Sequence, residues 1–99
     1  MTAREKQIID DIKQVLIKEL NPSRIILFGS RAKNTNGNHA DFDIAVDIKQ
    51  PSTTIQREIN EKIEQIIGLY KADVVYLGSV DVEFKNLIEN GGKVIYERK

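Results

Sequence analysis

The sequence predicts a small α/β (α+β) domain, in which a mixed sheet of three or four strands is flanked by helices. Three observations support this fold class. Apolar segments of strand length alternate with segments of helical periodicity, turn-forming residues separate them, and no repeat or low-complexity tract interrupts the series. With 99 residues, the chain is expected to form one domain, residues 1–99, around a core of modest size.

The first predicted helix follows a capping box, in which Thr2 stands three residues before Glu5. Apolar residues then recur at the spacing of one helix face: Ile8, Ile9, Ile12, Val15, Leu16 and Leu20. Asn21 and Pro22 end this helix. Residues 25–28 are apolar throughout, as expected for a strand that is buried on both faces.

The segment 29–33 turns after this strand, and the sequence allows a short helix to begin there. A polar loop rich in turn-forming residues follows over residues 34–39. The second strand is predicted at about residues 41–48, and Pro51 closes it.

The second long helix opens on another capping-box pattern, in which Thr53 stands three residues before Gln56. Its isoleucines are predicted to face inward: Ile55, Ile59, Ile63, Ile66 and Ile67. A third strand follows at about residues 72–77, then a last helix near residues 81–89 and a short strand at residues 93–96. The apolar side chains expected on the last helix are Phe84, Leu87 and Ile88.

The composition excludes several classes of function. Fifteen basic and fifteen acidic side chains balance, so no net charge draws the chain to nucleic acid, and we expect no direct nucleic-acid binding. The chain has no cysteine, which excludes disulfides, thiolate catalysis and zinc-ribbon sites and is compatible with a reducing cytosol. No segment has the length and apolarity of a membrane span or a leader peptide, so a soluble, cytoplasmic protein is expected.

The most informative motif is a pair of aspartates, Asp41 and Asp43, at the start of the second strand. Because side chains alternate along a strand, both carboxylates point the same way while Phe42 points into the core. A third aspartate, Asp73, heads the third strand. Carboxylates aimed together repel unless a cation lies between them, and Mg²⁺ with its oxygen ligands is the obvious candidate.

Gly29 and Ser30 suggest a phosphate site at the end of the first strand. Gly29 has no Cβ and lets an anion approach the backbone, Ser30 adds a hydroxyl, and the following amides point at the anion if they open a helix. Alone, this pair favours a plain turn; together with the three aspartates it describes a phosphate cradle opposite a metal site. Arg31 is a further candidate for phosphate contact, with a solvated turn arginine as the alternative. His39 is expected to be exposed and uninvolved.

As a set, these residues resemble the polymerase-β-type nucleotidyltransferase superfamily: Gly29-Ser30, ten intervening residues, Asp41-x-Asp43, and Asp73 on a later strand. The short chain and its closing segment, residues 88–96, are more narrowly similar to the minimal nucleotidyltransferases, the antitoxins of HEPN/minimal-nucleotidyltransferase toxin–antitoxin modules. Two positions depart from the pattern and remove no ligand. A small hydroxyl residue often precedes the first aspartate, where this chain has alanine, and residue 42 is bulkier than the usual aliphatic.

The resemblance implies roles for these residues. Asp41 and Asp43 would hold two Mg²⁺ ions, and Asp73 would complete the shell of the catalytic ion and assist deprotonation of the acceptor hydroxyl. Gly29 and Ser30 would hold the β- and γ-phosphates of ATP. The reaction implied is transfer of AMP to a tyrosine of a partner HEPN ribonuclease toxin, with the chain acting as antitoxin in a hetero-oligomer with that toxin.

Three alternatives stay open. A small-molecule transferase of the aminoglycoside type would need substrate-binding structure that 99 residues hardly supply. A haloacid-dehalogenase-type phosphatase also uses Asp-x-Asp after a strand, but it leaves Gly29-Ser30 unexplained. A non-catalytic antitoxin would inhibit its toxin by contact alone, with the three aspartates idle.

Overall fold

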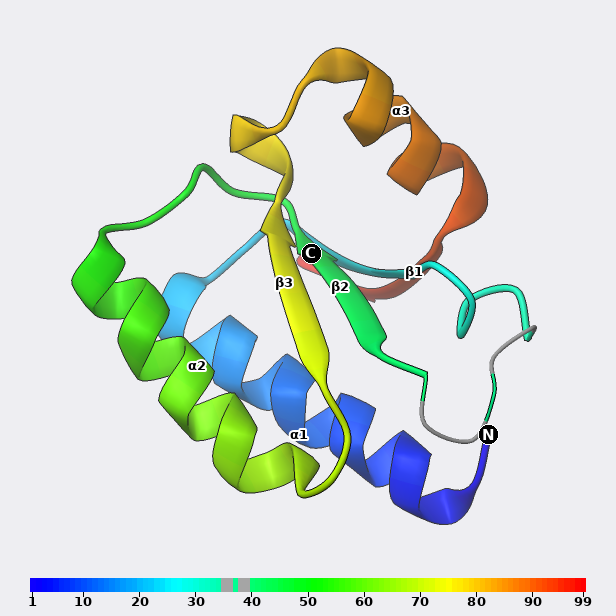
Figure 1. The fold of residues 1–99 in the computed structure, drawn as a ribbon. Coiled ribbons are helices and arrows are strands. Elements are labelled where there is room, and N and C mark those ends of the chain that lie inside the picture. The colour runs from blue at the N-terminus through cyan, green and yellow to red at the C-terminus, as the bar shows by residue number, and fades with distance from the viewer. Residues whose placement is uncertain (35–36, 38–39) are drawn as a thin grey trace.

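A computed structural model describes residues 1–34, 37 and 40–99, and it contains a four-stranded mixed sheet with helices on both faces (Figure 1). In chain order the elements are α1 (Ala3–Leu20), β1 (Arg24–Phe28), β2 (Phe42–Val46), α2 (Thr53–Ile67), β3 (Ala72–Tyr76), the 3-10 helix η1 (Leu77–Ser79), α3 (Val82–Gly91) and β4 (Lys93–Glu97). The predicted fold class is confirmed. No helix in the described ranges combines the length and apolarity that a membrane crossing would need.

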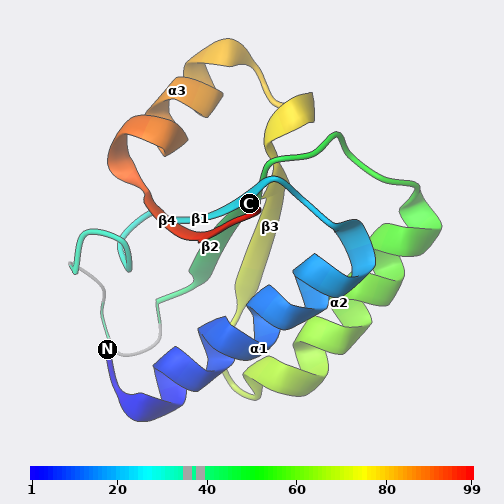
Figure 2. The ribbon, with the colours of Figure 1, turned by 180° about the vertical axis from the view of Figure 1, so that it is seen from behind.

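The strands lie in the order β3-β2-β1-β4. Strand β1 is antiparallel to both β2 and β4, whereas β2 and β3 are parallel and are joined by the crossover through α2. Helices α1 and α2 lie side by side on one face of the sheet, and α3 covers the other face (Figures 1 and 2).

Each face of the sheet contributes to a core of its own. The larger core lies between the sheet and the α1–α2 pair, and its buried side chains include Ile8, Ile12, Leu16, Ile25, Leu27, Phe42, Ile44, Val46, Ile59, Ile63 and Ile67. The smaller core lies under α3 and contains Ile26, Ala45, Leu77 and Ile88. Leu27 and Ile26 lie in different cores because neighbouring side chains on a strand point to opposite faces.

The observed helix ends agree in part with those predicted from the sequence. Both bonds of the Thr2–Glu5 capping box are present, and Asn21 ends α1 in the left-handed conformation at φ 46°. For α2, however, the predicted capping box is wrong by one residue. Ser52 is the N-cap, and its side chain accepts a hydrogen bond from the Ile55 amide.

Two apolar side chains of the predicted helices are exposed. Ile55, which was predicted to face inward, is 38% exposed because it lies in the first turn of α2, ahead of the residues that pack on the sheet. Leu87 is 70% exposed, since Phe84 and Ile88, four residues apart, form the face of α3 that meets the sheet.

The segment after Gly29 turns as predicted, and the short helix that the sequence allowed does not form, because residues 30–34 form turns. The Lys33 amide donates to the Ser30 carbonyl at 3.2 Å, and the Asn34 amide donates to the Arg31 carbonyl at 3.5 Å. His39 lies outside the described residues.

Candidate active site

The topology brings three parts of the sequence together at one edge of the sheet. Because β1 is antiparallel to β2, the end of β1 lies beside the beginning of β2. Because β3 is parallel to β2, the beginning of β3 lies there too. In the observed register, Asp43 is paired with Phe28 on one side and with Asp73 on the other. Gly29, Asp43 and Asp73 therefore gather at the same edge.

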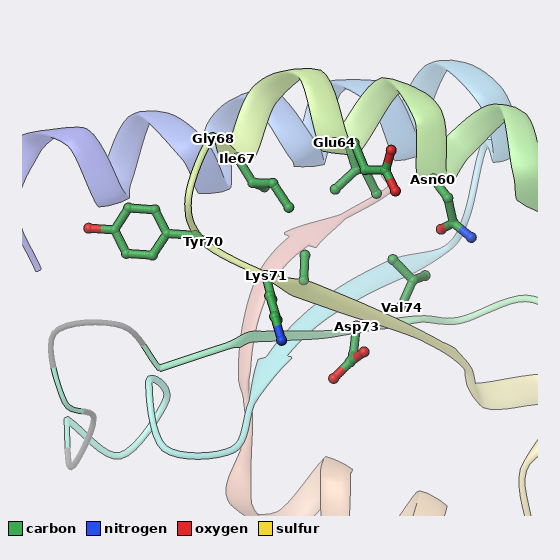
Figure 3. Close-up of a pocket in the computed structure, with 10 residues that line it drawn as sticks. Asn60, Glu64, Ile67, Gly68, Tyr70, Lys71, Asp73 and Val74 are labelled. Carbon is green, nitrogen blue, oxygen red and sulfur yellow. The ribbon is translucent and has the colours of Figure 1, made fainter.

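Asp43 and Asp73 leave the sheet on the face that α3 covers. They hold paired positions on parallel strands, and Ala45, two residues after Asp43, belongs to the core under α3. Figure 3 shows the Asp73 side chain pointing away from α2, whereas Val74 points toward it. Asp43 is half-buried, while Asp73 is exposed, as is Asp41 immediately before β2.

Among the described residues, the three carboxylates form a negative site without a positive partner. The pKa of Asp43 is raised above its usual value, first by burial and then by the charges of Asp73 and Asp41. Within the described ranges, no lysine or arginine forms an ion pair with any of the three. The charge repulsion that the sequence predicts is therefore present.

Gly29 is required for the position of Asp43. Its φ of +74° lies in the left-handed region, and a Cβ built on it would collide with Oδ2 of Asp43. The sequence predicts that an anion approaches the backbone at Gly29. In the structure, the Asp43 carboxylate lies beside Gly29, so a phosphate bound there would be next to this carboxylate.

The chemistry of these donors fits a hard divalent cation, because carboxylate oxygens are the ligands that Mg²⁺ takes. In the part of the chain that is described, no group of three or more histidine, aspartate or glutamate side chains is arranged to hold a metal ion. Asp43 and Asp73 are neighbours on adjacent strands, and Asp41 stands immediately before β2. Closing a ligand set around one ion requires the three carboxylates to turn toward a common point.

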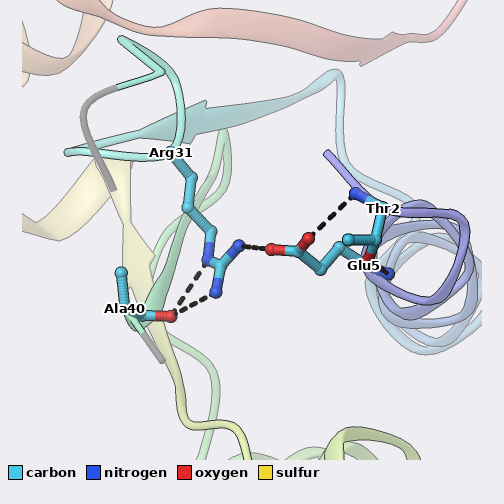
Figure 4. Close-up of polar contacts among 4 residues, drawn as sticks. All are labelled: Thr2, Glu5, Arg31 and Ala40. Atoms are coloured by element: carbon cyan, nitrogen blue, oxygen red, sulfur yellow. Dashed lines mark hydrogen bonds and ion pairs between the residues drawn. The ribbon is translucent and has the colours of Figure 1, made fainter. Parts of the chain in front are cut away.

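Arg31 occupies a different place from the one predicted. Its side chain is fully buried, forms an ion pair with Glu5, and stacks over the Phe42 ring with the guanidinium carbon 3.9 Å from the ring centroid. Its Nε and Nη2 donate to the Ala40 carbonyl at 3.0 and 2.6 Å (Figure 4). A guanidinium with these partners is not available to a phosphate, so Arg31 is no longer a candidate for phosphate contact. The alternative of a solvated turn arginine is also wrong, because the side chain is buried.

The Arg31 contacts instead connect α1 to the first aspartate. Ala40 and Phe42 stand on either side of Asp41, and both are held by the same guanidinium. Hydrogen bonds from the Thr2 backbone amide and then from Arg31 lower the pKa of Glu5 from 4.5 to about 2. The sequence suggested Glu5 only as a capping residue. The one feature of the sequence that could have indicated the buried position of Arg31 is the unusual aromatic at position 42, because its ring lies beneath the guanidinium.

Asp41, Asp43 and Asp73 form what we call the acidic edge of the sheet. A cavity lies on each side of it. The first, of about 550 Å³, lies between the end of α2 and the edge strand β3, and its polar lining includes Asn60, Glu64, Lys71 and Asp73 (Figure 3). The second, of about 490 Å³, lies between the end of β1 and α3 and is lined in part by Gly29. The site is thus open toward β3 and toward α3.

Comparison with known proteins identifies the family. The family model described as polymerase beta, nucleotidyltransferase matches residues 10–99. Among curated protein sequences, none matches the chain.

Several solved structures share the fold. A crystal structure of a toxin–antitoxin with AMP-PNP is similar at a TM-score of 0.76 and 24% identity, over 91% of this chain and 73% of that chain. A mutant of the toxin–antitoxin MntA-HpeT gives 0.70 and 22% identity, over 92% and 73% of the two chains. A protein provisionally assigned as a minimal nucleotidyltransferase gives 0.68 and 15% identity, over 93% and 95%. Since the family model spans residues 10–99, this chain belongs to the polymerase beta nucleotidyltransferase family, and the expectation of a nucleotidyltransferase is confirmed.

Proposed function

We propose that this chain transfers AMP from ATP to a tyrosine hydroxyl of a partner HEPN ribonuclease toxin, in a reaction that depends on Mg²⁺, and thereby acts as an antitoxin. The observation that carries the proposal is the acidic edge, where Asp43 is paired with Asp73 and lies close to Gly29, and where no cation among the described residues pairs with the carboxylates. Family membership supplies the reaction class. The similarity to toxin–antitoxin structures supports the choice of partner.

In this proposal the aspartates have distinct roles. Asp41 and Asp43 would hold the metal, and Asp73 would add a ligand and accept the proton of the acceptor hydroxyl. When bound, Mg²⁺ neutralises charge on the phosphates of the nucleotide. Gly29 and Ser30 would contact the β- and γ-phosphates, because they directly follow β1, whose last residue pairs with Asp43.

In the proposed reaction, AMP is transferred by an in-line displacement at the α-phosphorus of ATP. The acceptor oxygen forms a bond to the α-phosphorus, while the bond between that phosphorus and the oxygen bridging to the β-phosphate breaks. Pyrophosphate leaves with that bonding pair, and the hydroxyl proton passes to Asp73. Arg31 takes no part in these bonds; its contacts hold Ala40 and Phe42 and so position Asp41 between them.

The test is modification of the purified partner toxin by the full chain with ATP and Mg²⁺, followed by mass spectrometry. We expect the partner to gain the mass of AMP, and Asp41→Asn or Asp43→Asn to slow the reaction by roughly 10²-fold or more. Asp10→Asn is the matched control, because Asp10 lies on the exposed side of α1 in a surface ion pair with Lys13.

The competing function is inhibition by contact alone. If the toxin stays unmodified with wild-type chain, ATP and Mg²⁺, yet the pair still neutralises toxicity, the chain is a binding antitoxin and the proposed transfer is wrong.

A further inference from the structure

The cavity between the end of α2 and β3 extends over one edge of the sheet (Figure 3). In the described sheet β3 is an edge strand, with β2 as its neighbour. Residues that point to opposite faces of β3 line the same cavity: Val74 points toward α2, whereas Lys71 and Asp73 point away from it. A cavity that is lined from both faces of an edge strand has to run along the outer edge of that strand.

The register of β3 shows which of its backbone groups are directed to this edge. The Phe42 amide donates to the Lys71 carbonyl at 2.8 Å, so the backbone groups of Lys71, and of Asp73 two residues later, are turned toward β2. The N–H and C=O groups of Ala72 and Val74 are therefore directed away from β2, on the side where the cavity runs. Backbone groups at the edge of a sheet are a template for the main chain of another segment.

The lining of the cavity favours a side chain with an apolar stem and a positive end. Ile63 and Ile67, which are buried on the inner face of α2, give it an apolar floor. Among the described residues that line it, Glu64 and Asp73 are acidic and Lys71 is basic, so the lining has a net negative charge. A lysine or arginine can lay its stem on an apolar surface while its charged end meets a carboxylate.

We propose that the acceptor segment of the partner toxin binds in an extended conformation along the outer edge of β3, with its tyrosine on the face of Asp73 and a basic side chain next to it near Glu64. The inference rests on the proposed function, in which Asp73 would accept the proton of the acceptor hydroxyl. Because side chains alternate along an extended segment, the neighbours of the tyrosine point to the α2 face, where Ile63 and Ile67 form the floor.

The choice of this occupant follows from the position of Asp73. Asp73 lines the cavity and also belongs to the acidic edge, so a segment that fills the cavity is continuous with the place of transfer. A hydroxyl carried on the same side of the segment as Asp73 would face the residue that takes its proton. The main-chain pairing fixes the register of the segment, and the side chain near Glu64 adds selectivity.

Amide hydrogen exchange, measured by NMR, tests the strand pairing directly. The full chain is compared alone and with the purified partner toxin, in Mg²⁺ and an ATP analogue whose α–β bridge cannot be cleaved. We expect exchange at the Ala72 and Val74 amides to slow by about tenfold or more in the complex, because both gain hydrogen-bond partners. The Asp73 amide is the internal control and should change little, since it is already turned toward β2.

A matched pair of glutamates on α2 tests the contact with the basic side chain. Glu64 and Glu61 are both exposed on the same helix, and of the two only Glu64 lines the cavity. Glu64→Lys should raise the KM for the toxin by about fivefold or more and leave ATP binding unchanged. Glu61→Lys makes the same change of charge and should leave this KM within about twofold of wild type.

Four results would overturn the inference. Unchanged exchange at Ala72 and Val74 in the complex, or equal effects of Glu64→Lys and Glu61→Lys, would mean that the toxin reaches Asp73 by another path, and the proposed function stands if the toxin still gains AMP. Slow exchange at both amides in the chain alone, together with a dimeric mass, would assign the edge to a second copy of the chain. A toxin that wild type never modifies would remove the proposed function, and with it the acceptor.

Discussion

The Asp43 carboxylate lies where a side chain on Gly29 would begin, so these two residues depend on each other. Gly29 directly follows β1 and has a φ of +74°, and Asp43 on β2 is paired with the preceding residue, Phe28. Gly29 of the Gly-Ser motif therefore allows Asp43 of the Asp-x-Asp motif to take its observed position. A phosphate bound at Gly29 would lie next to the Asp43 carboxylate. Because both groups are negatively charged, a cation between them would be needed to offset their repulsion.

Gly29→Ala should destabilise the fold and displace Asp43. The left-handed backbone costs an alanine about 1–2 kcal/mol, and the collision with Asp43 adds to this. Denaturant unfolding measures the loss. Gly37→Ala is the control, because a Cβ there would meet no described residue within 4 Å.

A double-mutant cycle separates the two costs of Gly29→Ala. If the collision matters, Asp43→Ala should recover part of the stability lost in Gly29→Ala. Equal losses for the alanine substitutions at positions 29 and 37 would contradict the coupling of Gly29 to Asp43.

Arg31→Met should cost about 3–5 kcal/mol of folding stability, because it leaves the Glu5 carboxylate buried without its partner. Arg31→Lys keeps the charge but not the paired hydrogen bonds to the Ala40 carbonyl, so it should lower transferase activity more than its stability loss explains. The measurements are unfolding free energy and kcat for each variant at a temperature where it is folded.

Lys62→Met is the control for Arg31→Met, since Lys62 forms an exposed ion pair with Glu19, and such a pair contributes about 0–1 kcal/mol. Arg31→Met and Lys62→Met with the same effect on stability would show that the Arg31 pair does not connect α1 to the site.

Stability should depend on pH through Glu5. Because folding lowers the pKa of Glu5 from 4.5 to about 2, its carboxylate stabilises the folded state fully above about pH 4.5, and this contribution is lost as the pH falls toward 2. The difference in unfolding free energy between wild type and Glu5→Gln should therefore be constant from pH 7 to about 4.5 and shrink below that. A difference that stays the same down to pH 2 would mean that Glu5 has an ordinary pKa in the folded chain.

Patterns that depend on near neighbours in the sequence predicted the structure well. The apolar run before Gly29 and the alternation around Asp43 are local, and both identify the strands that form, although β2 is shorter, Phe42–Val46, than the predicted 41–48. The clustering of Asp43 with Asp73 follows from the parallel register, which the crossover through α2 makes possible.

Features that depend on distant packing could not be predicted in this way. Arg31 and Glu5 are 26 residues apart, and nothing local indicates that α1 packs against the turn after β1. That packing also buries the guanidinium, which changes Arg31 from a candidate ligand into a positioning residue. The cavity beside Gly29 could not be predicted for the same reason. It is formed by β1 and α3, and α3 follows β1 by more than fifty residues in the chain.

The most direct test of the acidic edge as a metal–nucleotide site is a set of four melting curves. Wild type and Asp43→Asn are each melted in chelator and again in Mg²⁺ with a non-hydrolysable ATP analogue. In chelator, Asp43→Asn should melt at the higher temperature, because burial and the charges of Asp73 and Asp41 disfavour the Asp43 carboxylate. Mg²⁺ with the analogue should raise the melting temperature of wild type and raise that of the variant much less. A wild type that is the more stable protein in chelator and gains nothing from Mg²⁺ and nucleotide would show that Asp43 is a structural residue and that the metal site is wrong.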